Sequence, residues 1–208
     1  MKGITPYLPL DPTLALPLKD KAIEVYKRSA RLEASIQPGL KDAVAHLLRY
    51  VNSYYSNKIE GNNTKPADVI KAQHAKEEEL DPAIRDDRKE IISHLIAQES
   101  LALKKPSVSE VCSAEFIQWI HELFFEDLSE QARTLTLEST GETFLVQAGK
   151  FREQRVTVGK HIPPEEAELA KSMKLFHRAY RLDWIHGDER LLAAAASHHR
   201  LLWIHPFL

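Results

Sequence analysis

The residue best placed for acid–base chemistry is His205, near the end of the alanine-rich stretch LLAAAASHHRLLWIHPFL. Five residues recur there at intervals of four and three and would share one helix face: Leu191, Ala195, His198, Leu202 and His205. This spacing predicts a buried stripe that ends at His205, just before Pro206 forces the backbone out of the helix. Because imidazole titrates near neutral pH, His205 could take a proton from a hydroxyl. The alternative is a helix-terminal histidine that only interacts with unsatisfied carbonyls.

A second candidate is Glu60, a carboxylate close to the expected end of a helix in the run SNKIEGN, residues 56–62. A negative charge at a helix C-terminus faces an unfavourable dipole and therefore needs a cationic partner. The alternative is a solvated glutamate before a capping residue, Gly61.

The stretch from Arg133 to Gly159 has a different texture, with many Thr and Val residues, three glycines and little helical periodicity. Residues 143–147 and 155–158 are predicted to be the two strands of a hairpin. An exposed strand of this kind could pair with an extended target peptide. The alternative is a plain surface hairpin.

We predict no metal site. His198, His199 and His205 do not have the H-E-x-x-H spacing of a zinc site, and the residues after His121 do not complete it either. Cys112 lies on a predicted helix without a basic neighbour, so we expect a buried structural thiol there.

These residues must be positioned by helices. Apolar periodicity predicts helices over 19–36, 40–61, 66–80, 82–103, 109–127, 164–180 and 191–203. Helix 40–61 carries an apolar stripe of Val44, Leu47, Leu48, Val51, Tyr54 and Tyr55. Four early prolines (Pro6, Pro9, Pro12 and Pro17) predict an extended N-terminal arm, and Ser109 is expected to cap the helix that follows it. The sequence therefore predicts an all-α fold with one small β-hairpin.

The totals describe an ordinary soluble protein. The 208 residues carry a net charge of −2, and no basic recognition helix appears, so nucleic acid is not an expected partner. The N-terminus lacks the pattern of a signal peptide, and no apolar run approaches the length of a membrane span. With a single cysteine, the chain is expected to be cytoplasmic.

Three segments, in this order, resemble motifs of the Fic (Fic/Doc) family. Residues 56–62 are similar to its inhibitory S/T-x-x-x-E-G/N motif. Residues 149–164 resemble the segment G-x-[FY]-R…V-x-[VI]-G…PP, which forms a flap in relatives. This resemblance implies that the target binds along Arg155, Val156, Thr157, Val158 and Gly159. His205, Pro206 and Phe207 resemble the start of the signature H-P-F-x-D/E-G-N-G-R. The resemblance implies an N-terminal helical region, residues 1–108, whose inhibitory helix is about 40–61. It implies a catalytic domain over 109–208 that is truncated at its C-terminal end.

By this resemblance, the intact form is a protein adenylyltransferase that moves AMP from ATP, with Mg²⁺, onto a Ser, Thr or Tyr hydroxyl of a protein. His205 would be the base. Glu60, with Ser56 and Gly61, would inhibit by pairing with the second arginine of the signature, which keeps the γ-phosphate out of place. The rest of the signature lies beyond Leu208, so we expect this fragment to be inactive. The alternative is a non-catalytic helical module that binds a protein partner, with a homodimer as one form.

Overall fold

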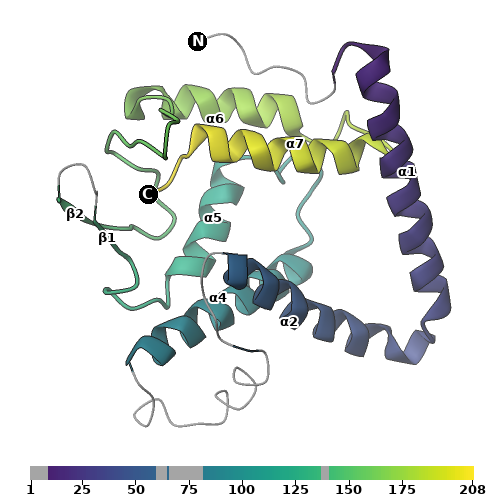
Figure 1. Ribbon diagram of the computed structural model, residues 1–208, viewed down its shortest axis with the longest axis horizontal. Coiled ribbons are helices and arrows are strands. Elements are labelled where there is room, and N and C mark those ends of the chain that lie inside the picture. Colours follow the sequence, from purple (N-terminus) through teal and green to yellow (C-terminus); the bar gives the residue numbers. More distant parts are fainter. Residues whose placement is uncertain (1–8, 60–64, 66–81, 137–140) are drawn as a thin grey trace. The chain divides into compact units, whose positions relative to one another are not determined.

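The computed structural model describes residues 9–59, 65, 82–136 and 141–208. Over these residues the chain is helical with one small sheet, as the sequence predicts (Figure 1). The helices are α1 (Pro12–Ser35), α2 (Lys41–Ile59), α4 (Pro82–Lys104), α5 (Ala114–Phe125), α6 (Glu166–Tyr180) and α7 (Glu189–Ile204), with a 3₁₀ turn η1 (Pro38–Leu40). The strands are β1 (Thr134–Thr136) and β2 (Thr143–Leu145). In the described part of the chain, no helix is both long and apolar enough to span a bilayer.

Contacts divide the chain into two compact units that are discontinuous in sequence. The first unit contains residues 1–36, 106–118 and 151–208, and the second contains residues 37–105 and 119–150. The predicted boundary at residue 108 divides the chain by expected function, whereas these units are defined by contacts. The boundary therefore stays a prediction.

Helix α1 begins earlier than the sequence analysis expected, so the extended arm is wrong from Pro12 onward. Asp11 caps the helix, because its carboxylate accepts a hydrogen bond from the Thr13 backbone N–H at 2.9 Å. Pro12 occupies the first helical turn, where a missing N–H costs nothing. Pro17 lies inside the helix nevertheless. Within the first unit α1 packs against α7, with buried Ala22 and an ion pair of 2.9 Å between Lys19 and Glu189.

The contact between α2 and α4 in the second unit is made by small polar side chains. Ser53 and Asn57 are buried, and the Ser53 hydroxyl donates to the Ile91 carbonyl at 3.3 Å. Asn57 donates to the Ser53 carbonyl at 2.8 Å and its Nδ2 lies 3.5 Å from His94 Nδ1. The apolar stripe that predicted this helix is largely exposed instead, at Leu47, Leu48, Val51 and Tyr55. Tertiary contacts, rather than apolar periodicity, decide which face of α2 is buried.

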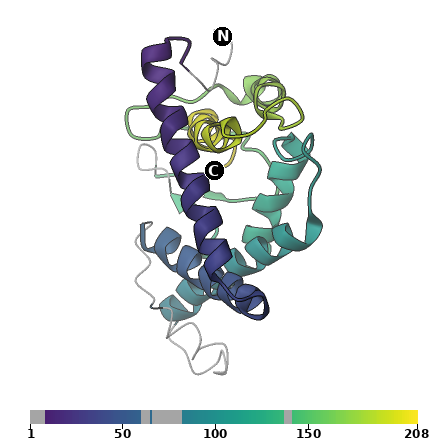
Figure 2. The same ribbon diagram turned by 90° about the vertical axis from the view of Figure 1, so that its right-hand side faces the viewer.

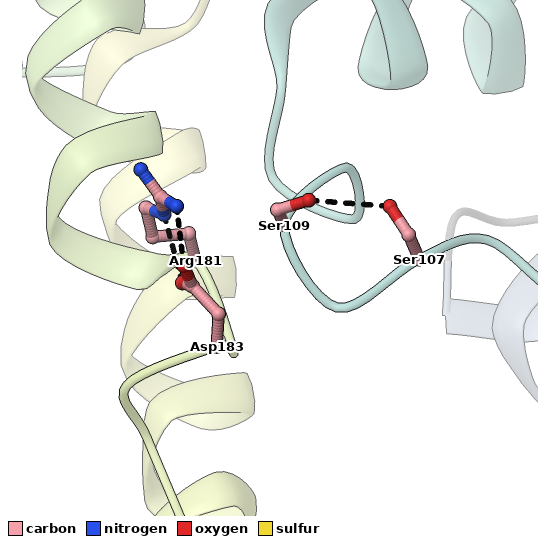
Figure 3. Close-up of polar contacts among 4 residues, drawn as sticks. All are labelled: Ser107, Ser109, Arg181 and Asp183. Atoms are coloured by element: carbon pink, nitrogen blue, oxygen red, sulfur yellow. Dashed lines mark hydrogen bonds and ion pairs between the residues drawn. The ribbon is translucent and has the colours of Figure 1, made fainter.

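Helix α5 is capped by Ser113, not by Ser109. The Ser113 hydroxyl accepts from the Phe116 N–H at 3.1 Å, and its carbonyl accepts from the Ile117 N–H at 3.1 Å. Ser109 belongs to the preceding turn, where its hydroxyl lies 3.3 Å from that of Ser107 (Figure 3). Cap chemistry alone does not distinguish two serines four residues apart, and the helix starts at the later one.

The turn that contains Ser109 is joined to the loop after α6. The Leu182 backbone N–H donates to the Val108 carbonyl at 2.8 Å. The loop itself is closed by a bidentate contact between the Arg181 guanidinium and the Asp183 carboxylate (Figure 3). This charge-assisted contact stabilises the first residues of the connection between α6 and α7.

The small sheet is present, but one of its predicted strands is wrong. Strand β2 lies within the predicted run 143–147, yet it pairs antiparallel with β1, placing Thr134 opposite Leu145 and Thr136 opposite Thr143. Residues 155–157 form no strand, and Val158 makes only an isolated bridge with His161. The sequence predicts two extended runs, 143–147 and 155–158, and does not predict β1, which lies nearer to β2 along the chain than residues 155–158 do.

The core of the first unit lies between α6, α7 and the start of α5. Figures 1 and 2 show α6 and α7 side by side. The fully buried members of this core include Met173, Phe176, Ile185 and Ile204. Ile204 immediately precedes His205, so the last turn of α7 is fixed by the best-packed part of the unit.

Candidate active site

The backbone of His205 has an unusual conformation. His205 is the C-cap of α7, with φ 47° and ψ 63° in the left-handed region, and its N–H donates to the Leu201 carbonyl at 2.8 Å. A non-glycine residue pays about 1–2 kcal/mol for this conformation. Surrounding contacts must therefore hold it, and such strain concentrates at functional sites.

Those contacts come from Arg152. Its side chain is only 4% exposed, and its Nε donates to the His205 carbonyl at 2.7 Å. Nη1 donates to the Gln154 carbonyl at 2.8 Å, and Nη2 donates to the Pro164 carbonyl at 2.5 Å. The Arg152 backbone N–H donates to the Pro206 carbonyl at 2.8 Å. One residue thus binds two consecutive carbonyls at the end of α7.

Aromatic packing reinforces the same junction. Phe151 and Phe207 have ring centroids 5.3 Å apart, and both pack against the core of the first unit. Pro206, which precedes Phe207 in the chain, is buried. The segments GKFR (149–152) and HPF (205–207), which the sequence analysis treated as separate motifs, therefore interlock through Phe151 and Arg152.

The residues predicted to bind the target lie next to this junction. Residues 155–158 lead to a tight reversal at Gly159, which has φ 61°, and Val158 and His161 then exchange two backbone hydrogen bonds of 2.9 and 3.0 Å. Val156 is buried, whereas Arg155, Thr157, Val158 and Gly159 are exposed. His161 Nε2 donates to the Trp203 carbonyl at 2.8 Å, which joins the reversal to the last turn of α7.

The electrostatics of this junction favour a neutral imidazole at His205. Burial, followed by the positive charge of Arg152 and the electrostatic influence of His161, lowers the pKa of His205 below its ordinary value of 6.5. The ring is therefore unprotonated at neutral pH, with a lone pair available to accept a proton. Burial also lowers the pKa of Arg152, and the charge of Glu166 opposes that change. The guanidinium stays charged, because arginine is not deprotonated in proteins.

A surface pocket of about 290 Å³ adjoins His205. Its lining consists of two imidazoles and apolar or backbone groups: His198, Leu201, Leu202, His205, Pro206, Phe207 and Leu208. The predicted buried stripe on α7 is wrong, because Ala195, His198 and Leu202 are exposed and the buried face carries Ala193 and Ile204 instead. The predicted face nevertheless supplies His198, Leu202 and His205 to the pocket.

The lining of this pocket does not fit a magnesium ion. Mg²⁺ prefers oxygen ligands, and none of the seven lining residues has a carboxylate side chain. Among the described residues, no group of three or more His, Cys, Asp or Glu side chains could hold a metal ion. No chemical step is therefore assigned to a metal at these residues.

Of the predicted inhibitory residues, Ser56 is among the residues that the structure describes. Ser56 is exposed near the end of α2, in the second unit. Glu60 and Gly61 lie outside the described residues, so the inhibitory contact stays a prediction. Cys112 is buried as expected, and burial raises the pKa of its thiol to about 11.

Sequence reasoning missed Arg152 and His161 as members of the site. In the sequence, Arg152 was noted only as part of the G-x-F-R pattern, and no sequence feature indicated a role for His161. The useful clue was a charged residue beside a buried aromatic at the start of a non-helical segment. Such an arginine must find several acceptors inside the fold, because its five donors cannot be left unsatisfied.

Comparisons with known proteins identify the family that this chain resembles. Residues 111–208 match the model of the Fic/DOC family. "Protein adenylyltransferase Fic" of Nematostella vectensis is 26% identical over 159 residues, covering 74% of this chain and 32% of the relative. The protein of the same name from Drosophila erecta is 28% identical over 158 residues, covering 74% of this chain and 28% of the relative.

A solved structure supports the fold. The crystal structure of a Fic family protein from Desulfovibrio desulfuricans G20 aligns with a TM-score of 0.63 at 17% identity, covering 98% of this chain and 55% of that one. The matched residues, 111–208, form a Fic/DOC family domain that contains both α7 and the Arg152 junction. The chain spans about a third of the length of the curated relatives it matches.

Proposed function

We propose that the protein, in its intact form, transfers AMP from ATP to a hydroxyl group of a protein. The observation that supports this most directly is His205 at the edge of a pocket, with a strained backbone and a pKa that burial lowers. The names of the matched relatives, protein adenylyltransferase Fic, point to the same reaction. A neutral imidazole beside a ligand-sized opening is the arrangement that general-base catalysis needs.

In the proposed reaction, His205 takes the proton of a Ser, Thr or Tyr hydroxyl as that oxygen attacks the α-phosphorus of ATP. A new bond forms between the hydroxyl oxygen and the α-phosphorus. The bond from the α-phosphorus to the oxygen that bridges it to the β-phosphorus breaks, and pyrophosphate leaves. The proton remains on His205 until solvent removes it. Because burial and Arg152 keep the ring neutral, no proton has to be lost before the reaction begins.

The target peptide, which carries the hydroxyl, would bind along residues 155–159. Three of its side chains (Arg155, Thr157 and Val158) are exposed, and the reversal at Gly159 leads to His161, which binds the last turn of α7. An extended peptide that lies along this segment could form main-chain hydrogen bonds with little demand on its sequence. This part of the proposal rests on exposure and connectivity, since residues 155–157 form no strand.

The direct test uses the chain and a version continued beyond Leu208 by the remainder of the family signature. Each is incubated with ATP labelled at the α-phosphate and a protein lysate. We expect label on protein only with the continued version, and His205→Ala should reduce it by about 10²–10⁴-fold. His199→Ala is the matched control, because His199 is exposed on α7 and does not line the pocket. Equal labelling by both variants would refute the role of His205.

The inhibitory role of Glu60 is a separate part of the proposal. In the continued version, Glu60→Gly should increase labelling, because it removes the carboxylate that would pair with the signature's second arginine. Ser56→Ala tests whether the exposed hydroxyl of α2 contributes. Unchanged labelling with Glu60→Gly, in a preparation that loses activity with His205→Ala, would reject inhibition by Glu60 and leave the reaction standing.

A further inference from the structure

We propose that Arg152 is a positioning residue that makes the target-binding segment and the candidate base one rigid piece. This inference rests on the proposed function, whereas the hydrogen bonds of Arg152 do not depend on it. The Arg152 guanidinium binds the carbonyls of Gln154, Pro164 and His205 at 2.8, 2.5 and 2.7 Å. Gln154 and Pro164 lie at the two ends of the segment that contains Arg155–Gly159. One side chain therefore ties both ends of that segment to the base.

Only arginine has this geometry. Its donors are held in a planar fork, so three bonds in different directions fix three carbonyls relative to one another. A lysine would keep the charge, but its compact ammonium cannot reproduce the fork. All three acceptors are neutral carbonyls, although a buried charge is costly to desolvate. An apolar side chain would satisfy packing more simply, so the arginine is explained by the geometry that it imposes.

The strained backbone of His205 indicates what the hydrogen bonds of Arg152 stabilise. The ring direction depends on backbone angles of φ 47° and ψ 63°, which an isolated histidine rarely adopts. Arg152 binds the carbonyl of His205 through Nε and the carbonyl of Pro206 through its backbone N–H. These two bonds hold the residue on its C-terminal side, while the bond to Leu201 holds it on the other. Loss of the fork should let His205 relax and turn its ring.

The pKa of the His205 imidazole depends on this geometry and can be measured. Arg152 and His161 are the groups that act electrostatically on His205, and His198 also lines the pocket beside it. The Arg152 charge lowers the pKa of His205, so removing that charge should raise the pKa. An arginine that only stabilised the fold at a distance would leave this titration unchanged.

The test is an NMR titration of His205 in the chain as it stands, with its signals assigned by comparison with His205→Gln. Arg152→Gln should raise the pKa of His205, because burial remains but the charge is lost. Arg152→Lys should move the pKa less, yet shift the Cα signals of His205 and Pro206 away from left-handed values. Arg155→Gln is the matched control: Arg155 is exposed, lies three residues away and forms only a 3.5 Å ion pair with Glu165.

A measurement on the unmodified protein covers the case in which a variant fails to fold. The Arg152 Nε–H should exchange with solvent much more slowly than that of Arg155, because it is buried and donates to His205. Equally fast exchange at the two arginines would overturn the proposal. So would unchanged His205 signals in folded Arg152→Gln and Arg152→Lys. Neither readout needs ATP, so a failure here is distinct from a failure of the proposed AMP transfer.

In the continued version, kinetics separate positioning from nucleotide binding. Arg152→Lys should lower kcat by about 10–100-fold, because the base and the target are no longer held in register. The KM for the protein target should rise, whereas the KM for ATP should change little. Equal increases in the KM for the protein target and the KM for ATP, with kcat unchanged, would indicate a general weakening of the fold and contradict the positioning role.

Discussion

At the scale of single residues, the chemistry depends on a histidine held where histidine is rarely found. His205 is half-buried, left-handed and neutral, and each property has its own cause. Pro206 prevents the helix from continuing, Arg152 binds the carbonyl, and desolvation removes the proton. The sequence predicted the residue and its position at the end of the helix. It could not predict the backbone conformation, because that depends on an arginine 53 residues away.

The strain at His205 predicts an unusual order of stabilities. Glycine adopts the left-handed region without cost, whereas alanine pays for its Cβ. His205→Gly should therefore be more stable than His205→Ala by about 1 kcal/mol, the reverse of their usual order inside helices. Urea denaturation of the two variants, which both lack the imidazole, measures this difference directly. If His205→Ala is the more stable variant, the left-handed conformation is not present in solution.

At the scale of elements, the sequence predicted helices well and their edges and faces poorly. Helix α4 covers 82–104 where 82–103 was expected, because Pro82 is a clear start signal. Helix α1 starts at Pro12 because Asp11 caps it, a local signal hidden among four prolines. The exposed stripe on α2 and the strand β1 were not predictable, because burial and strand pairing depend on neighbours distant in sequence.

The cap of α5 offers a sharp test at this scale. Ser113→Ala removes the acceptor for the Phe116 N–H and should lower the free energy of unfolding by about 1 kcal/mol. Ser109→Ala, the matched control, removes only a contact with the Ser107 hydroxyl (Figure 3) and should cost less than about 0.5 kcal/mol. The two variants change the same atoms four residues apart. A larger loss with Ser109→Ala in thermal or urea unfolding would restore the original assignment of the cap.

At the scale of the whole molecule, the family motifs are distributed over two units, and each unit stabilises its own part. The first unit contains His205, Arg152 and the segment around Gly159. The second contains Ser56 and the turn at Gly149, which opens the G-x-F-R pattern. Motif order along the sequence predicted which segments matter. It did not reveal that residues 151 and 152 interlock with 205–207, because a linear pattern carries no information about side-chain contacts.

His121, which accepts a hydrogen bond from the turn at Gly149, makes the stability of the second unit depend on pH. The Gly149 N–H donates to His121 Nδ1 at 3.0 Å, and the imidazole stacks on Phe125 with centroids 4.3 Å apart. A ring that accepts at Nδ1 is neutral and has its proton on Nε2. Burial lowers the pKa of His121 from 6.5 to about 4. The folded protein therefore keeps the ring neutral under conditions in which the unfolded chain protonates it.

The sign of the effect follows from proton counts. Between pH 6.5 and about 4 the unfolded chain binds the extra proton, so the free energy of unfolding falls as the pH is lowered through that window. The loss attributable to His121 is on the order of 3 kcal/mol. His121→Asn keeps an acceptor for Gly149 and does not titrate, so its urea-unfolding free energy should fall less steeply between pH 6.5 and 4. His46→Asn, at an exposed position on α2, removes a histidine of the same unit without touching this contact. If both variants follow the unmodified protein across that range, the buried neutral ring does not connect pH to the turn at Gly149.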